Sequence, residues 1–269
     1  MKREIETEIY SARESVDLVL RRPNYVKNVI GLYALTFYGA ERSRLMRASY
    51  LPVRKVDDAL DGDAPKIKNP LLYARILRDN IARNIFGKSP EEQLLRYSLD
   101  VLEEKRKPND DPRGDFVRAI DAIIFDHERA SERRVLSAEK IERYYRNAFD
   151  PVINITLLAI DSNLRSGDIP SLSYGQGRVY SARDFKEDWQ RGIINVPEDV
   201  ISSAGLYPLS LFEEAGGNSK IIDWFHQSLV VTKPDLLEAQ LLLRQSGERQ
   251  TQVVGNSLIS PMLKYIEAH

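Results

Sequence analysis

The chain of 269 residues contains no cysteine and only three histidines. The absence of cysteine excludes disulfides, thiolate catalysis and cysteine-based metal or iron–sulfur sites. No histidine triad is indicated. With 39 basic and 40 acidic residues the formal net charge is −1, which is not the balance of a strongly basic nucleic-acid surface, so no nucleic-acid partner is expected.

Long hydrophobic runs are also missing. The longest apolar stretch, Val29 to Ala40, is too short to cross a bilayer and predicts a buried core helix. The first residues, MKREIETEIYSARE, lack the apolar segment of a signal peptide and are expected to remain in the mature protein. These features predict a cytoplasmic protein, which would reach a lipid substrate by accepting an amphiphile or by docking at the periphery of a membrane.

Helix signals dominate what is present, and sustained two-residue alternation of a strand is hard to find. Three helix starts are marked by a capping residue followed by proline, namely Asn69–Pro70, Ser89–Pro90 and Ser260–Pro261. The breaks between helical segments are short, and no repeat or long linker divides the chain. The sequence therefore predicts an all-α fold, a single domain over residues 1–269 built as a helical bundle of about ten helices around a central cavity.

Two acidic clusters, at residues 53–63 and 182–200, are the most informative motifs. Asp57 and Asp61 are four residues apart, as are Asp184 and Asp188, so each pair shares one face of a helix. An acidic helix surface would give the same spacing. Bulky apolar neighbours, however, suggest that the acids line a pocket, where their repulsion would be relieved by a divalent cation. Two such faces turned toward each other would form a magnesium cage.

At these residues the sequence resembles the squalene and phytoene synthase family, the head-to-head trans-prenyltransferases. The second aspartate-rich motif of that family is matched in order by Arg183, Asp184, Glu187, Asp188, Arg191, Gly192, Ile194, Pro197 and Asp199. The first motif is matched by Tyr50, Arg54, Asp57, Asp58 and Asp61. The resemblance covers roughly residues 40 to 205 and implies an isoprenoid-synthase-type helical bundle.

The resemblance implies a Mg²⁺-dependent prenyltransferase that ionises an allylic prenyl diphosphate of 15 or 20 carbons and couples it head to head with a second one. Departing diphosphate needs cationic partners, and the carbocation needs an apolar, aromatic-lined cavity. The expected catalytic residues are Asp57, Asp61, Asp184, Asp188, Arg54 and Tyr50. The expected metal ligands are Asp57, Asp58, Asp61, Asp184, Glu187 and Asp188. The expected substrate contacts are Arg54, Arg183, Arg191, Tyr180, Tyr145 and Phe37.

Several positions depart from the family pattern. A glutamine and an asparagine that precede the second motif are replaced here by Gly177 and Tyr180. A histidine-and-serine-rich motif upstream is replaced by Arg22 to Gly31, in which only Lys27 and Asn28 could substitute. These changes spare the ionisation residues and concern the binding of a second prenyl diphosphate.

Three functions follow: head-to-head coupling, a single-substrate class I terpene synthase or transfer to another acceptor, and a catalytically silent assembly or binding factor. The intact acidic quartet argues against the silent factor, and the prevalence of coupling in the family places coupling first. Chain length, a need for NADPH and oligomeric state are not readable from the sequence.

Some residues also have a purely structural interpretation. Arg54 with Asp58, and Arg183 with Glu187, have the spacing of ion pairs within a helix. Tyr144, Tyr145 and Phe37 fit helical core packing as well as a carbocation pocket. The AspHisGlu run at 126–128 predicts surface, and a basic patch formed by Arg42, Arg44 and Arg47 predicts a solvated face, a membrane contact or a diphosphate contact.

Overall fold

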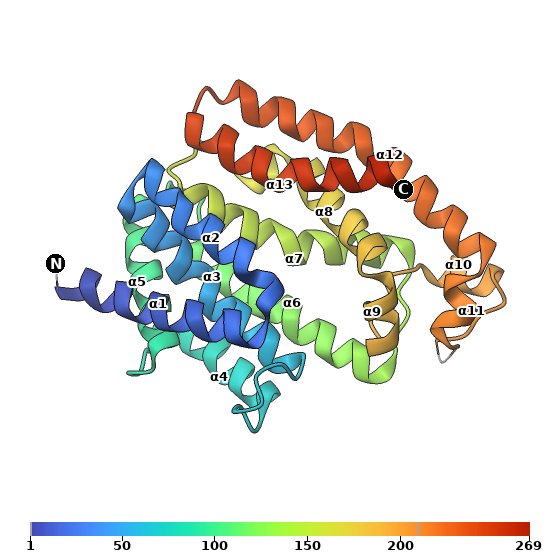
Figure 1. Ribbon diagram of the computed structural model, residues 1–269, viewed down its shortest axis with the longest axis horizontal. Helices are drawn as coiled ribbons and strands as arrows, with labels where there is room; N and C mark the ends of the chain where they lie inside the picture. The colour runs from blue at the N-terminus through green and yellow to red at the C-terminus, as the bar shows by residue number, and fades with distance from the viewer. Residues whose placement is uncertain (1, 209) are drawn as a thin grey trace. The chain divides into compact units, whose positions relative to one another are not determined.

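The computed structural model describes residues 2–208 and 210–269. The described residues form thirteen α-helices and three short 3-10 helices, with no strand among them (Figure 1). The all-α prediction is confirmed. Among the described residues, no helix is both long enough and apolar enough to cross a membrane.

The chain forms two compact units, Met1–Ile124 with Asn154–Asn163, and Phe125–Ile153 with Leu164–His269, here called unit 1 and unit 2. The single-domain prediction is not tested by this division. Unit 1 contains α1 Lys2–Arg21, η1 Pro23–Tyr25, α2 Val26–Ala34, η2 Leu35–Tyr38, α3 Ala40–Leu60, α4 Pro70–Arg83 and α5 Pro90–Lys105. Unit 2 contains η3 Ser166–Asp168, α8 Pro170–Arg183, α9 Phe185–Arg191, α10 Glu198–Ser203, α11 Phe212–Gly216, α12 Ser219–Gln245 and α13 Arg249–Ala268. Two helices, α6 Pro112–Glu132 and α7 Ala138–Ala159, contribute residues to both units.

Two of the three predicted helix starts are confirmed. Asn69 caps α4 by accepting a hydrogen bond from the Leu72 backbone at 3.1 Å, and Ser89 caps α5, with Glu92 completing the capping box. The start predicted at Pro261 is wrong, because this proline lies inside α13. Ile259 and Met262, which are fully buried on either side of it, hold the helix in its direction through packing.

In unit 1, α3 is the central helix, because α1, α2, α4 and α5 all pack against it. The core consists of leucine, isoleucine and aromatic side chains from these helices, together with Phe116, Ile120 and Leu158 from α6 and α7. The predicted buried helix at residues 29–40 is wrong, since α2 and η2 contain no buried residue. This apolar segment packs against α3 by one side only and leaves Ile30 and Phe37 exposed.

In unit 2, α8 packs against α12 and α13, which run side by side in opposite directions (Figure 1). The sequence predicts one helix over roughly residues 175–190, but the structure has two helices that are interrupted at Asp184. The second of them, α9, ends at Gly192, whose φ of 92° is strained for residues with a side chain. A Cβ atom at Gly192 would also lie 2.4 Å from the Ala130 carbonyl oxygen, so this glycine of the motif is required by the backbone.

Candidate functional site

The first acidic cluster lies at the C-terminal end of α3. Asp57 and Asp58 are in the last turn of the helix, and Asp61 is its C-cap, with its backbone N–H donating to the Asp57 carbonyl at 2.9 Å. Asp63 follows in the turn. The helical spacing predicted for Asp57 and Asp61 is therefore realised, although Asp61 lies at the helix end and not within it.

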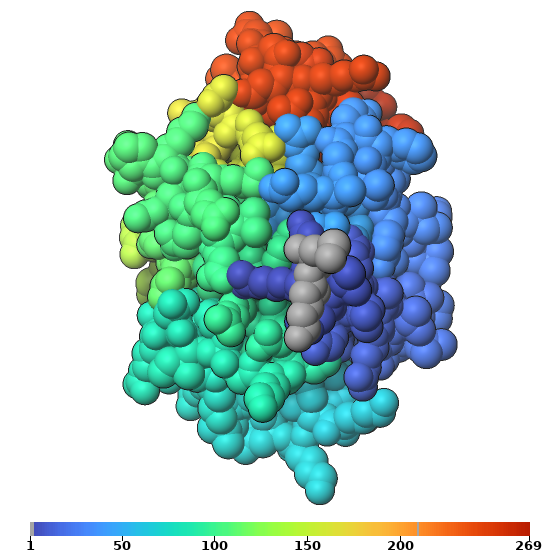
Figure 2. All heavy atoms as spheres, turned by 90° about the vertical axis from the view of Figure 1, so that its left-hand side faces the viewer, coloured from blue at the N-terminus to red at the C-terminus, as the bar shows by residue number. Residues whose placement is uncertain are grey.

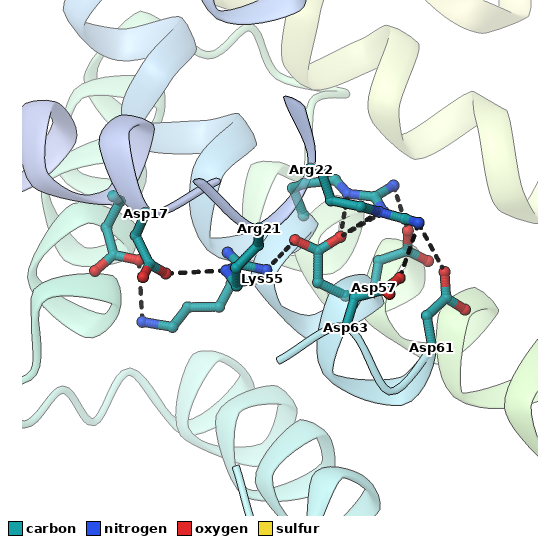
Figure 3. Close-up of polar contacts among 10 residues, drawn as sticks. Asp17, Arg21, Arg22, Lys55, Asp57, Asp61 and Asp63 are labelled. Atoms are coloured by element: carbon teal, nitrogen blue, oxygen red, sulfur yellow. Dashed lines mark hydrogen bonds and ion pairs between the residues drawn. The ribbon is translucent and has the colours of Figure 1, made fainter. Parts of the chain in front are cut away.

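Arg21 and Arg22 lie beside these carboxylates (Figure 3), and Arg54 also pairs with two of them. Asp58 is fully buried and accepts hydrogen bonds from Arg21 and from Nε of Arg54, the latter at 2.7 Å. Arg21 comes from the last turn of α1, so Asp58 ties α1 to α3. A buried carboxylate that is satisfied by two guanidinium groups has the environment of an anchoring residue, and removing one partner would leave an uncompensated charge. The assignment of Asp58 as a metal ligand stays a prediction.

The other acids of the first cluster are more accessible. Arg54 pairs with Asp57 at 2.5 Å, and Arg22 pairs with Asp61 at 3.5 Å and with Asp63 at 3.0 Å. The side chains of Asp57 and Asp61 are 33% and 22% exposed, whereas that of Asp58 is 0% exposed. The predicted ligand pair Asp57 and Asp61 is therefore reachable from solvent.

Arg22 and Arg54 of the first cluster share an aromatic neighbour, and Arg22 Nε lies 3.9 Å from the Asp58 carboxylate. The buried Nε of Arg22 has no hydrogen-bond partner among the described residues. The ring of Tyr25 lies under both guanidinium groups, 5.8 Å from Arg22 and 4.5 Å from Arg54. The three arginines contact five carboxylates, those of Asp17, Asp57, Asp58, Asp61 and Asp63.

Two further predicted residues of unit 1 have different surroundings. Tyr50 is largely buried on α3, and burial raises its pKa to about 12, opposed by a hydrogen bond with Asn28. Asn28 is one of the two polar residues predicted to substitute for the missing upstream motif. Phe37 is 92% exposed, so within unit 1 it does not line a cavity.

The second acidic cluster lies in unit 2 at the break between α8 and α9. Asp184 is both the C-cap of α8 and the N-cap of α9, and Asp188 lies one turn into α9, with its backbone N–H bonded to the Asp184 carbonyl at 2.9 Å. The i,i+4 relationship that was predicted within one helix is thus preserved across the break.

Asp188 belongs to a buried polar network. Asn195 donates to Asp188 at 2.9 Å and accepts from Arg129 at 2.6 Å. Arg129, which is 0% exposed, also donates to Asp126 at 2.7 Å, and the hydroxyl of Tyr144 donates to the same carboxylate. The prediction of plain surface at residues 126–128 is therefore wrong for Asp126, which faces this network.

The electrostatics of this network are unfavourable to a second negative charge. Burial, followed by repulsion from Asp184 and from Asp126, raises the pKa of Asp188 to about 7, against the opposing effects of Arg129 and Asn195. Near neutral pH this carboxyl is therefore partly protonated in the isolated chain. A cation bound beside Asp184 and Asp188 would relieve the repulsion and favour the ionised form.

The basic and aromatic residues predicted around the second cluster are mostly engaged with neighbours. Arg183 pairs with Asp184 at 2.6 Å, and its guanidinium stacks 4.4 Å from the Tyr180 ring centroid. Glu187 pairs with Arg191 at 2.9 Å. Arg183 is about half exposed, so it remains accessible to a ligand at Asp184.

Tyr145 is fully buried, as the core-packing interpretation predicts, and its hydroxyl bonds to Ser181 at 2.9 Å. Its ring lies directly on Gly177, where a Cβ atom would come within 2.1 Å of the ring. The glutamine of the family pattern therefore cannot stand at 177 in this packing. Its neighbour Gln176 is buried, bonds to Tyr180, and has an Oε1 atom with no hydrogen-bond partner among the described residues.

A pocket of about 240 Å³ in unit 2 has Tyr145 in its lining. It is lined by residues from α7, α8 and α12 together with Pro197, among them Trp224 and Arg178. Pro197 comes from the segment of the second acidic cluster, but Asp184, Glu187 and Asp188 are not among the described residues that line the pocket. The central cavity predicted between the two clusters is a different feature, and it stays a prediction because the clusters belong to different units.

The basic patch predicted on α3 is neutralised within unit 1. Arg44 pairs with Glu8 at 2.9 Å, Arg47 pairs with the same residue at 2.5 Å, and Arg42 pairs with Asp161 at 2.9 Å. These arginines attach α1 and the end of α7 to α3. They are therefore engaged as structural ion pairs.

Sequence reasoning missed several members of both clusters. Arg21 stands 37 residues before Asp58, and Arg22 stands 41 residues before Asp63, so no local spacing connects these pairs. Arg129 is likewise 66 residues from Asn195. The one available signal was the i,i+3 pairing of Asp126 with Arg129 on a helix otherwise rich in apolar residues.

The donor chemistry fits magnesium, since all predicted ligands are carboxylates. Among the described residues, no group of three or more histidine, aspartate or glutamate side chains is arranged to hold a metal ion. Magnesium is commonly held by one or two carboxylates together with water and substrate phosphates. Each cluster supplies such a pair, Asp57 with Asp61 and Asp184 with Asp188.

A scan against models of known protein families found no match, and a search of curated proteins found no similar sequence.

Proposed function

We propose that this chain is a magnesium-dependent prenyltransferase of the squalene and phytoene synthase type, which ionises an allylic prenyl diphosphate of 15 or 20 carbons and couples it head to head with a second. The observation that carries the proposal is the arrangement of the second acidic pair, in which Asp184 and Asp188 lie one turn apart at the break between α8 and α9 and Asn195 holds Asp188 at 2.9 Å. Burial and repulsion from Asp184 raise the pKa of Asp188 to about 7, so a neighbouring cation would favour full ionisation of the pair near neutral pH. The motif that contains this pair is the part of the sequence that most resembles the family.

The residues of unit 1 have complementary roles in this proposal. Ionisation breaks the bond between the allylic carbon and the diphosphate oxygen, and the electron pair leaves with the diphosphate. The guanidinium groups of Arg22 and Arg54 would donate hydrogen bonds to those oxygens. Asp57 and Asp61 would hold magnesium, which supplies neutralisation of the diphosphate charge when bound.

In unit 2, Asp184 and Asp188 would hold magnesium, with Glu187 as an accessory group. Asn195 fixes the orientation of Asp188 through its hydrogen bond of 2.9 Å, and Arg129 in turn holds Asn195. Arg183, stacked on Tyr180, can exchange its contact with Asp184 for a diphosphate oxygen without leaving the aromatic ring. These contacts keep the acidic pair oriented before a ligand arrives.

A single-substrate enzyme, either a class I terpene synthase or one that transfers the prenyl group to another acceptor, is the second candidate. The observation that favours it is the contact between Tyr145 and Gly177. The ring occupies the place of the polar side chain that the family has there, which removes one group associated with the second diphosphate. Coupling stays first because it is the prevalent reaction of the family that the two aspartate-rich motifs resemble.

Product analysis separates the two candidates. The purified chain is incubated with magnesium and either farnesyl or geranylgeranyl diphosphate, and the products are identified by mass spectrometry with and without NADPH. A hydrocarbon of 30 or 40 carbons, or a cyclopropyl diphosphate, supports coupling. A cyclic product or alcohol of 15 or 20 carbons supports the single-substrate enzyme. An absence of any product from substrates of 10 to 20 carbons contradicts both and favours a binding or assembly role.

A further inference from the structure

The first helix of the chain, α1, buries a mostly polar face and exposes an apolar one. α1 packs against α3 and α5, and the face that it buries there carries Thr7, Ser11, Glu14 and Ser15, each less than 7% exposed. The hydroxyls of Thr7 and Ser11 bond back to carbonyls one turn earlier in the same helix. Leu18 is the one large aliphatic residue of this helix that is fully buried. α1 therefore uses small polar residues to approach its own unit closely.

The opposite face of α1 is apolar and exposed. Ile5 is 55% exposed, Ile9 60%, Val16 60% and Leu20 76%. Apolar residues on this face recur at alternating spacings of four and three in the series Ile5, Ile9, Ala12, Val16, Val19. This is the heptad pattern by which one helix packs along another. An apolar stripe of about four turns on a surface marks an interaction site. The N-terminal part of α1, in dark blue, lies on the surface shown in Figure 2.

The charges of α1 favour a protein helix over a membrane as the occupant. A helix that lies in a membrane surface is rich in lysine and arginine along its polar face. α1 has four basic residues, Lys2, Arg3, Arg13 and Arg21, and five acidic residues, Glu4, Glu6, Glu8, Glu14 and Asp17. The neighbouring arginines of α3 do not add basic surface, because Arg44 and Arg47 are paired with Glu8.

We propose that two copies of this chain associate through the apolar face of α1, packed antiparallel as a short coiled coil. Pairing Ile5 with Val16 of the other copy places Ile9 against Ala12, so that the contact repeats itself by two-fold symmetry. Glu6 then lies beside Arg13 of the other copy, and Arg13 beside Glu6. Both side chains are exposed, and neither forms an ion pair among the described residues. The charges thus complement each other twice in one interface.

The antiparallel orientation follows from the neighbouring charges. In a parallel pair, Arg13 would face Glu8 of the other copy. Glu8 is already held by Arg44 at 2.9 Å and by Arg47 at 2.5 Å, whereas Glu6 is not. A contact of one helix pair is small for a protein interface, so the dimer exchanges with the monomer. Because α1 is already fixed to α3 and α5, little helical ordering is needed on association.

Sedimentation equilibrium of the full chain tests the proposal. Over a range of about 1 to about 200 μM, which brackets the affinities of small interfaces, the average mass should rise from 30.8 kDa toward twice that value. The variant Ile9→Lys/Val16→Lys should stay at the monomer mass with an unchanged thermal unfolding midpoint, because both side chains are exposed. The matched control Val230→Lys alters a residue of α12 that is 70% exposed and should dimerise like the wild type.

A charge exchange tests the orientation. Glu6→Arg should weaken association about tenfold, since two repelling pairs of arginines replace two attracting pairs, and Glu6→Arg/Arg13→Glu should restore it. Failure of the double variant to restore association would overturn the antiparallel arrangement. A wild-type chain that is monomeric throughout the range, or a dimer that survives Ile9→Lys/Val16→Lys, would overturn the proposal. Sedimentation with phosphatidylcholine vesicles that is lost in Ile9→Lys/Val16→Lys, by a chain that remains monomeric, would assign the face to lipid instead.

Discussion

Asn195 donates a hydrogen bond to the carboxylate of Asp188 at 2.9 Å, and this bond is the link between the second acidic pair and a buried arginine. The amide has a fixed orientation because its oxygen accepts from Arg129 while its nitrogen donates to Asp188. The Asn195 side chain therefore orients the acid and favours its ionised form, against the larger effects of burial and of repulsion from Asp184 and Asp126. Asn195 follows Arg191 and Gly192 in the sequence, so the acid is held by a residue seven positions further along the same segment.

Replacing Asn195 by leucine should raise the pKa of Asp188 above its value of about 7, because a hydrogen bond to the ionised form is lost. Carboxyl carbon resonances followed by NMR over pH measure this shift, with Asp188→Asn identifying the resonance. Arg129 would also lose an acceptor, which should lower the free energy of unfolding by about 1–3 kcal/mol. Asn256→Leu on α13, where the side chain accepts from Gln240, is the control and should leave the Asp188 pKa unchanged.

The stability of the chain should depend on pH through Asp188. Its folded pKa of about 7 lies above the unfolded value of about 3.9, so between these values the folded state binds more protons and stability falls as pH rises. Asp188→Asn should remove this component. The difference in unfolding free energy between wild type and variant should change by up to about 1 kcal/mol per pH unit between pH 4 and pH 7, measured in urea with a chelator present.

Burial also raises the pKa of Asp115 to about 6. Asp115 therefore contributes to the pH dependence of stability in the wild type and in Asp188→Asn alike. The difference in unfolding free energy between these two proteins cancels this contribution and isolates that of Asp188. A difference that is constant over this range would contradict the assignment.

Asp57 and Asp58 are neighbours in the sequence, but substituting them is expected to lower the stability of the fold by very different amounts. Asp58→Asn should destabilise the fold by about 3–5 kcal/mol, because it removes the charge between the buried guanidinium groups of Arg21 and Arg54. Asp57→Asn should cost less than about 1 kcal/mol, since its side chain is 33% exposed. Chemical denaturation of both variants gives the comparison. Equal losses in the two variants would mean that the cluster is not organised around Asp58.

Gly177→Ala should destabilise unit 2 by about 1–3 kcal/mol, because the new Cβ atom would displace the Tyr145 ring. The hydrogen bond between Tyr145 and Ser181 should be weakened at the same time. Gly31→Ala is the matched control on α2, where nothing lies within 4 Å of the new atom. That variant should be neutral or slightly stabilised, as expected for alanine in a helix. Thermal unfolding of the two variants decides, and a neutral Gly177→Ala would contradict the packing described here.

Local signals predicted the helices well and long-range contacts poorly. The caps at Asn69 and Ser89 involve residues within one turn, so their chemistry is legible in the sequence. Pro261 has the same local signature, yet packing on both sides keeps it inside a helix. The apolar run at residues 29–40 looked like core because periodicity reports which residues are apolar, and not whether a second layer covers them.

In the acidic clusters too, local spacing could be predicted from the sequence and long-range contacts could not. The spacing of Asp57 with Asp61 and of Asp184 with Asp188 was readable because it is helical. The arginines that neutralise the first pair, and the asparagine and arginine that orient the second, come from other segments. Whether an acid is a structural anchor, like Asp58, or an accessible one, like Asp57, depends on burial. Adjacent positions of one helix differ in burial without any difference in residue type.

Magnesium-dependent release of pyrophosphate from farnesyl or geranylgeranyl diphosphate tests the proposed ionisation most directly. The wild type should release pyrophosphate, and Asp57→Asn and Asp184→Asn should lose at least about 100-fold in rate while retaining their helical circular dichroism spectrum. Glu213→Gln on α11, an exposed acid outside both clusters, serves as the control and should match the wild type. Release by both aspartate variants at the wild-type rate, or no release by the wild type from any prenyl diphosphate of 10 to 20 carbons, would contradict the account.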